Sequence, residues 1–254
     1  MPALLEREVN GWFYNAYASR YETRDQLVRK LLRDEEDFVR ILRYCYAMPR
    51  RTVTALFPEI SSTRLDHLVG SGLLMEKVFS LPGGQQSVYM LTPDMMRAYG
   101  GGAAYRYYKA LFADDETVMS VACCAPFAAC TRPYFDSSAI EHGGMCLTRR
   151  GTGLFMTAVP GNVTEALRII TGAKGAYGGD SRILLVFDHM MSMRSVMAKI
   201  FSETGISDIG RLLFSFYAAG VDDAKQHIYM LRQVPDGIEM QRFRLSSIIK
   251  GAVT

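Results

Sequence analysis

The sequence lacks several features that would assign it to a class of protein directly. No apolar run reaches the roughly 18 residues of a membrane-spanning helix, and no charged-then-apolar leader of the secretory kind is present. The formal net charge is only +3 at pH 7. We therefore expect a cytoplasmic protein with no membrane partner, in which any nucleic-acid binding depends on a local basic patch.

The cysteines do not have the spacing of a metal site. They are odd in number, no histidine lies close to them in sequence, and most have apolar neighbours: Cys45, Cys123, Cys124, Cys130 and Cys146. Such cysteines usually act as small core residues in a reducing compartment. The sequence therefore predicts neither a metal nor a cofactor.

The composition is that of an ordinary globular protein. The 254 residues are 49% hydrophobic and 22% charged, which is enough for two domains or one large one. Up to Ala110 there are 15 Lys and Arg against 12 Asp and Glu, and after it 14 against 14. The basic excess thus belongs to the N-terminal part.

Residues 34–99 carry the pattern of three short helices and a β-hairpin. Apolar residues at i, i+3, i+4 and i+7 mark the first helix, which we expect to end before Pro49. A two-turn helix ends at Pro58, and the third helix begins at a capping serine, Ser61 or Ser62. Two β-type runs then flank the loop "LPGGQQ", whose glycines suit a hairpin turn.

This order of elements is that of a winged helix-turn-helix, which predicts double-stranded DNA as a partner. The third helix of such a unit enters the major groove and the hairpin extends beside it as a wing. The expected DNA-contacting residues lie on the second helix, the third helix and the hairpin tip: Arg50, Arg51, Thr52, Ser62, Thr63, Arg64, His67, Gln85 and Gln86. Asp66 opposes phosphate on the same face, and a protein-interaction or dimerisation module remains the alternative.

One run of about 60 residues, from Ile41 to Tyr99, also carries a longer pattern. An arginine-containing helix enters "LDHLVGSGLL", a glycine-containing hairpin follows, and the aromatic-x-Leu-Thr-Pro sequence from Tyr89 to Pro93 comes next. The run resembles the N-terminal winged helix of the replication-relaxation family, proteins of mobile plasmids and conjugative elements. The resemblance implies a role in replication, mobilisation or transcription control, and a restriction-endonuclease-like fold in the C-terminal part.

The C-terminal part itself predicts an α/β domain with a mixed sheet. Asp114 is expected to cap a helix, residues 144–160 read as a hairpin, and "RILLVFD" and "RLLFSFYAAG" are strands of the buried kind. The fold class is then α+β or α/β, with a winged helix before a mixed-sheet domain. We divide the chain into a lead segment (1–33), a winged helix (34–99), a linker or connecting helix (100–113) and the α/β domain (114–254).

No catalytic motif of a nuclease is evident. Restriction-endonuclease-like folds bind a divalent metal with an acidic residue and an acidic-x-Lys motif on neighbouring strands. Residues 144–160 contain no Asp, Glu or Lys, and "VDDAK", residues 221–225, is expected in a loop. Asp188 follows a buried strand, where it either lies at a ligand site or caps the next helix. We predict no enzyme, no catalytic residue and no metal ligand.

Three functional hypotheses remain. The first is a DNA-binding accessory or regulatory protein of a mobile genetic element, acting as a homodimer whose α/β domain engages a protein partner. The second is a ligand-responsive transcription regulator, in which the α/β domain is the sensor. The third is an active metal-dependent nuclease.

Overall fold

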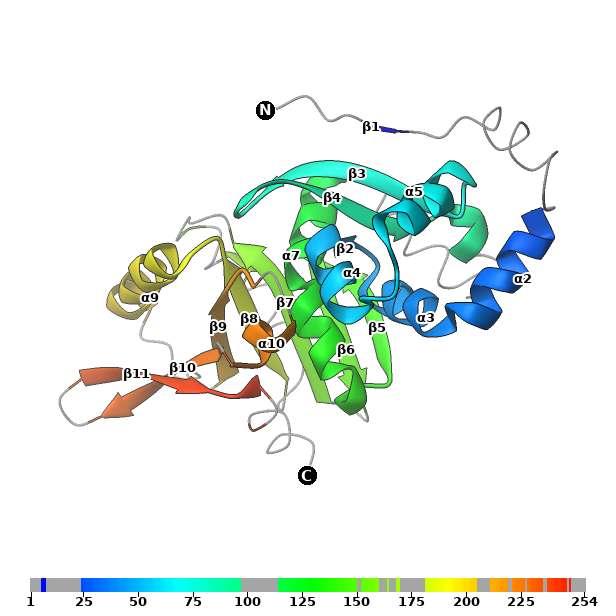
Figure 1. Ribbon diagram of the computed structural model, residues 1–254. Helices are drawn as coiled ribbons and strands as arrows, with labels where there is room; N and C mark the ends of the chain where they lie inside the picture. Colours follow the sequence, from blue (N-terminus) through cyan, green and yellow to red (C-terminus); the bar gives the residue numbers. More distant parts are fainter. Residues whose placement is uncertain are drawn as a thin grey trace.

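The computed structural model describes residues 6–7, 24–96, 114–149, 152–159, 164, 168–169, 181–204, 211–218, 221–226, 228–234, 237–245 and 247. These residues form a mixed α and β architecture with two sheets (Figure 1). The long helix α7 (Asp115–Thr131) lies between the N-terminal elements and the larger sheet. The expected linker at 100–113 lies outside the described residues.

The N-terminal elements from residue 24 to residue 70 are four helices and one short strand, joined by short connections. In chain order they are α2 (Arg24–Asp34), α3 (Glu36–Cys45), the short strand β2 (Met48–Pro49), α4 (Arg50–Leu56) and α5 (Ser62–Gly70). Helix α2 occupies the end of the expected lead segment (1–33). Val28, Leu31 and Leu32 are spaced at i, i+3 and i+4, and Leu31 is fully buried, so the apolar signal for this helix was present in the sequence.

Helix α5 begins and ends where its sequence predicts. The Ser61 side chain accepts a hydrogen bond from the backbone N–H of Arg64 at 3.1 Å, which identifies Ser61 as the capping serine. Leu65 and Leu68 form the buried stripe. After the helix ends, Gly72 adopts a φ of 68°, a left-handed conformation that glycine accepts without strain.

The smaller sheet is built on a long hairpin. Strands β3 (Leu74–Leu81) and β4 (Gly84–Leu91) pair antiparallel, with Pro82 and Gly83 between them. Strand β2 pairs with β4, and β1 (Glu6–Arg7) pairs with β3, so that the order is β1-β3-β4-β2. The glutamines expected in the loop belong to strand β4 instead, because the strands are longer than predicted.

The larger sheet is mixed and has the order β11-β10-β9-β8-β7-β6-β5. Strands β7, β8 and β9 are parallel to one another, and the remaining neighbours pair antiparallel. The predicted hairpin and both buried strands are confirmed. The strands are β5 (Ser137–Glu141), β6 (Gly144–Arg149), β7 (Thr152–Val159), β8 (Arg182–Phe187), β9 (Leu212–Phe216), β10 (Ile228–Val234) and β11 (Gly237–Phe243).

Helices cover both faces of this sheet. Successive residues of a strand point to opposite faces, so Leu184 packs in the cluster that includes α7, whereas Leu185 packs with Met193 of α9 (Met190–Thr204). Residues 221–225, expected in a loop, belong instead to the short helix α10 (Val221–Gln226), which contacts α7 and α4. Packing of Ala224 into the core explains the helical turns there.

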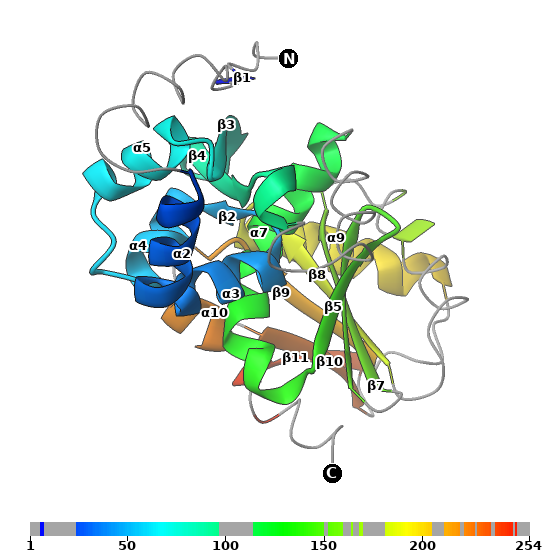
Figure 2. The same ribbon diagram turned by 90° about the vertical axis from the view of Figure 1, so that its right-hand side faces the viewer.

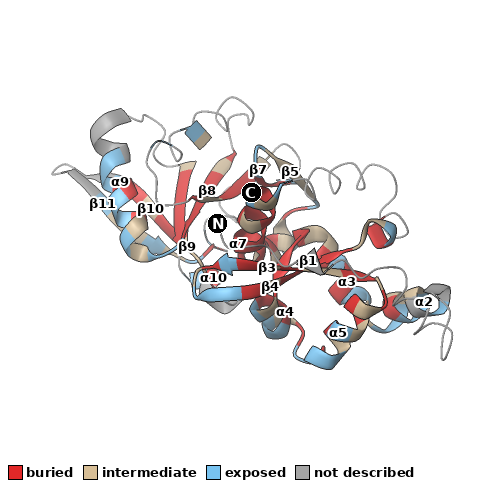
Figure 3. Ribbon diagram, turned by 90° about the horizontal axis from the view of Figure 1, so that it is seen from above, coloured by how far each residue is buried: buried red, intermediate tan, exposed pale blue. Residues whose placement is uncertain are grey.

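A single hydrophobic cluster joins the N-terminal elements to the larger sheet. Leu42 of α3, Val88 of β4, Val121 of α7 and Met156 of β7 all belong to it, and each is fully buried. Figure 2 shows α7 between helices α2 to α4 and the strands. Seen from above, buried residues form the middle of the molecule, and the exposed positions include the outer surfaces of α4 and α5 (Figure 3). The domain limits drawn from the sequence stay a prediction.

Candidate nucleic-acid interface

The first turn of α5 presents polar side chains to solvent. Ser62, Thr63 and Asp66 are exposed, whereas the apolar residues on the other side of the helix are buried. The N-terminus of a helix carries partial positive charge and backbone N–H groups that favour anions. Two hydroxyl groups therefore lie where a phosphate would be favoured, with one carboxylate on the next turn.

Arg64, expected to project from α5 toward DNA, instead turns toward the joint between α2 and α3. Its guanidinium makes a two-pronged ion pair with Glu35, with Nε 2.7 Å from Oε1 and Nη2 3.2 Å from Oε2. The arginine side chain is 24% exposed and the glutamate 17%. Glu35 separates α2 from α3, so this contact ties α5 to the joint between those helices. The expectation that Arg64 is free to read a base edge is corrected.

His67 takes part in the same cluster. Its Nδ1 lies 3.1 Å from Nη1 of Arg64, and the imidazole is half-buried. Because a guanidinium can only donate, Nδ1 accepts this hydrogen bond and the other ring nitrogen carries the proton. His67 thus supports the Arg64–Glu35 pair.

The residues expected at the start of α4 fall into two groups. Thr52 is fully buried, and its hydroxyl has no hydrogen-bond partner in the described part of the chain. Thr52 faces the core because it and Val53 form the inner side of α4, a helix only two turns long. The expectation that Thr52 contacts DNA is therefore wrong. Arg50 is half-buried, and Arg51 is exposed.

Arg51 lies beside the turn of the hairpin. A Cβ atom placed on Gly83 would be 3.3 Å from Nη1 of Arg51. Gly83 has a φ of 92°, which the tight turn requires. The structure therefore brings one exposed guanidinium and the turn of the hairpin together, although they lie in separate elements.

One face of the hairpin packs on the rest of the molecule. Gln86 is buried, its Nε2 donates to the carbonyl of Pro82 at 3.2 Å, and the hydroxyl of Tyr217 donates to its Oε1 at 3.1 Å. Lys77 of β3 forms a 3.2 Å ion pair with Asp115 of α7. The expectation that Gln86 reaches a DNA groove is corrected, because strand alternation turns it inward while Gln85 stays exposed.

A second region gathers polar side chains at the carboxyl ends of β7 and β8. Asp188 and His142 line a cavity of about 630 Å³ there. Asp188 Oδ1 accepts the backbone N–H of His189 at 2.8 Å, and His189 Nδ1 accepts that of Ser192 at 3.0 Å. His189 therefore caps α9 directly, and Asp188, expected as the cap, orients the residue before the helix.

Comparisons of the chain with models of protein families, with curated proteins and with solved structures found no match. In the part of the chain that the structure describes, no helix combines the length and apolar character needed to cross a membrane. The same residues contain no group of three or more His, Cys, Asp or Glu side chains placed to hold a metal ion. The described cysteines are free thiols, and burial raises the pKa of Cys123 and Cys130 to about 12.

Proposed function

We propose that this protein binds double-stranded DNA through α4, α5 and the β3–β4 hairpin, which together act as a winged helix-turn-helix. The observation that carries the proposal is the pairing of β2 with β4, in which Met48 lies opposite Tyr89. This pairing closes a small sheet immediately before α4, and α5 then leads directly into β3. Helix, strand, helix, helix and hairpin is the order of elements that presents the third helix to a major groove.

The DNA-contacting surface that we propose is smaller than the sequence suggested. It comprises Ser62 and Thr63 at the start of α5, Arg51 beside the hairpin turn, and Gln85 on the outer face of β4. Hydroxyl groups, guanidinium groups and helix N-termini are common phosphate-binding groups. Arg64 and His67 support this surface from behind by holding α5 against Glu35.

DNA binding as a homodimer is part of the proposal, because the positive charge of this surface is weak. Asp66 and Glu59 are exposed near the proposed contacts and reduce the attraction for phosphate. Two copies bound to one duplex would offset this by avidity, with their α5 helices about one DNA turn apart. The role that we propose is accessory or regulatory, in replication, mobilisation or transcription of a mobile element, as the resemblance to the replication-relaxation family implies.

DNA binding can be tested by fluorescence anisotropy on labelled duplexes from the DNA that flanks the gene, across a salt series. Arg51→Ala should weaken binding to every duplex and reduce the slope of log K against log salt by about 0.9, the value for one lost phosphate contact. Arg194→Ala is the matched control. Arg194 is an exposed arginine on α9, which covers the face of the larger sheet opposite to α7. Its binding should equal that of the wild type.

A second pair of variants separates contact from support. Thr63→Ala should weaken binding without changing the unfolding free energy, since Thr63 is exposed. Arg64→Ala should lower the unfolding free energy by about 1–3 kcal/mol, because it leaves the partly buried Glu35 carboxylate without its partner. Salt-independent binding, equal in wild type, Arg51→Ala and Thr63→Ala, would contradict the proposal and favour a protein-interaction module.

A further inference from the structure

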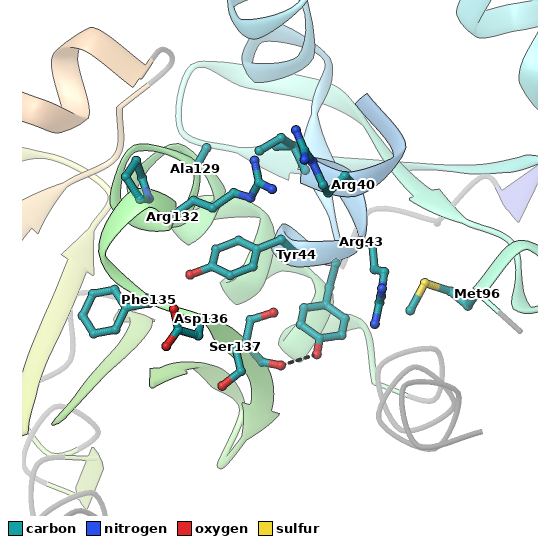
Figure 4. Close-up of a pocket in the computed structure, with 13 residues that line it drawn as sticks. Arg40, Arg43, Tyr44, Met96, Ala129, Arg132, Phe135, Asp136 and Ser137 are labelled. Atoms are coloured by element: carbon teal, nitrogen blue, oxygen red, sulfur yellow. Dashed lines mark hydrogen bonds between the residues drawn. The ribbon is translucent and has the colours of Figure 1, made fainter. Parts of the chain in front are cut away.

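A cavity of about 670 Å³ lies where α3 meets the end of α7 and the edge of the larger sheet. Its walls come from α3, the short 3-10 helix η1 (Arg132–Tyr134) and strand β5. The polar residues that line it include Arg40, Arg43, Tyr44, Arg132, Asp136 and Ser137 (Figure 4). Its volume is in the range of small-molecule sites, and none of these residues belongs to the proposed DNA-contacting surface.

The charge lining this cavity is strongly positive. Three arginines face a single carboxylate, that of Asp136, which is itself 3.7 Å from Arg149. Arg40 pairs with Asp37 on the exposed side of α3. Arg132 forms no ion pair with any residue that the structure describes. An uncompensated guanidinium in a concave wall is suited to hold a phosphate, to which it can donate two parallel hydrogen bonds.

Tyr44 contributes its ring to the wall of this cavity. Its hydroxyl is shielded from solvent and has no hydrogen-bond partner in the described part of the chain. Burial raises the pKa of Tyr44, so the hydroxyl stays protonated. In the view of Figure 4 the Tyr44 ring lies between Arg132 on one side and Asp136 and Ser137 on the other. Because this hydroxyl is closed off from the cavity, Tyr44 offers a ligand the face of its ring and not a hydrogen-bond donor.

We propose that this cavity binds a small phosphomonoester whose organic part carries hydroxyl or amino groups. Arg132 holds the phosphate, Arg40 and Arg43 add positive charge to the same cavity, and Asp136 and Ser137 accept hydrogen bonds from the organic part. The Tyr44 ring packs beside the ligand. The inference stands on this cavity alone and does not depend on DNA binding. A nucleotide or a sugar phosphate has this chemistry, and so does the 5′-phosphate end of a nucleic acid.

Isothermal titration calorimetry on the full chain tests the site with AMP, ribose 5-phosphate, inorganic phosphate, adenosine and a 5′-phosphorylated oligonucleotide as probes. We expect at least one of the two phosphomonoesters to bind more tightly than inorganic phosphate, and adenosine not to bind. Arg132→Ala and Arg132→Gln should each weaken binding about tenfold or more, since both remove a charge-assisted hydrogen bond.

Arg194→Ala, on the far face of the sheet, should bind like the wild type. The glutamine variant keeps most of the side-chain volume of Arg132, so its result stands if the alanine variant unfolds. Equal affinity of wild type and Arg132→Gln would overturn the proposal, as would adenosine binding as tightly as AMP, or no binding of either phosphomonoester at millimolar concentration. Binding of the 5′-phosphorylated oligonucleotide without binding of AMP or ribose 5-phosphate would overturn the assignment to a small molecule.

Discussion

Individual polar side chains in the N-terminal part act mainly as structural contacts. Arg64 forms an ion pair with Glu35, and Gln86 forms hydrogen bonds with Tyr217 and Pro82. Thr52 is enclosed in the core, where its hydroxyl makes no hydrogen bond with the residues that the structure describes. These three residues have the chemical groups of DNA contacts, yet they are unable to reach a partner without giving up packing or hydrogen bonds.

Thr52→Val tests this distinction for one residue. Valine replaces the buried hydroxyl with a methyl group of nearly the same shape, so we expect the unfolding free energy to rise by about 1 kcal/mol. Urea denaturation followed by circular dichroism measures the change. Thr54→Val is the control, because the exposed Thr54 hydroxyl donates to the carbonyls of Arg50 and Arg51, and its loss should bring no gain. A loss of stability in Thr52→Val would show that its hydroxyl has a partner.

At the scale of elements, tight contacts between neighbouring strands leave little room for change at certain glycines. Gly144 begins β6, where a Cβ atom would lie 2.5 Å from the carbonyl oxygen of Met156 and 2.8 Å from a ring carbon of Phe155. Gly70 ends α5, and a Cβ atom there would have no neighbour within 4 Å. One glycine is required by packing, and the other is not.

The alanine variants of these two glycines should therefore differ in sign. Gly144→Ala should lower the unfolding free energy by about 3 kcal/mol or more, because a backbone carbonyl must move to admit the methyl group. Gly70→Ala should raise it by about 0.5 kcal/mol, since alanine is the better helix former. Thermal and urea unfolding of both variants beside the wild type measure this. A Gly144→Ala protein of unchanged stability would contradict the tight approach of β6 to β7.

At the scale of the whole molecule, the shared hydrophobic cluster couples the N-terminal elements to the larger sheet. Helix α7 contacts α3 and β2 on one side and β6 and β7 on the other. The Lys77–Asp115 ion pair and the Tyr217–Gln86 hydrogen bond add polar contacts between the same parts. A DNA-binding surface on α4 and α5 and a ligand in the arginine-lined cavity would therefore act on one continuous structure.

This continuity predicts that the two parts unfold together. Hydrogen exchange measured by mass spectrometry along a urea series should show the hairpin 74–91 and strands β7 and β8 losing protection at the same urea concentration. Leu42→Ala, which leaves a hole in the cluster on the α3 side, should lower the unfolding free energy by about 2–5 kcal/mol and shift both regions equally. If only the hairpin shifted, the two parts would be separate cooperative units.

The sequence by itself determined most of the local elements. Apolar periodicity located α3, α5 and the buried strands β8 and β9. The capping serine located the start of α5, and the turn glycines located the turns of the hairpins. These signals could be read from the sequence because they act between near neighbours. The same periodicity is present in α2, at Val28, Leu31 and Leu32. The mixed sheet of the C-terminal part was likewise predictable from alternating strands and helices.

Only the tertiary structure decided which polar side chains are available to a partner. Glu35 lies 29 residues before Arg64, and Tyr217 lies 131 residues after Gln86, so no local pattern could pair them. The arginine-lined cavity likewise combines α3, η1 and β5, which are brought together by the packing of α7. Periodicity shows which face of an element is apolar, whereas the covering of a polar position depends on how distant segments dock.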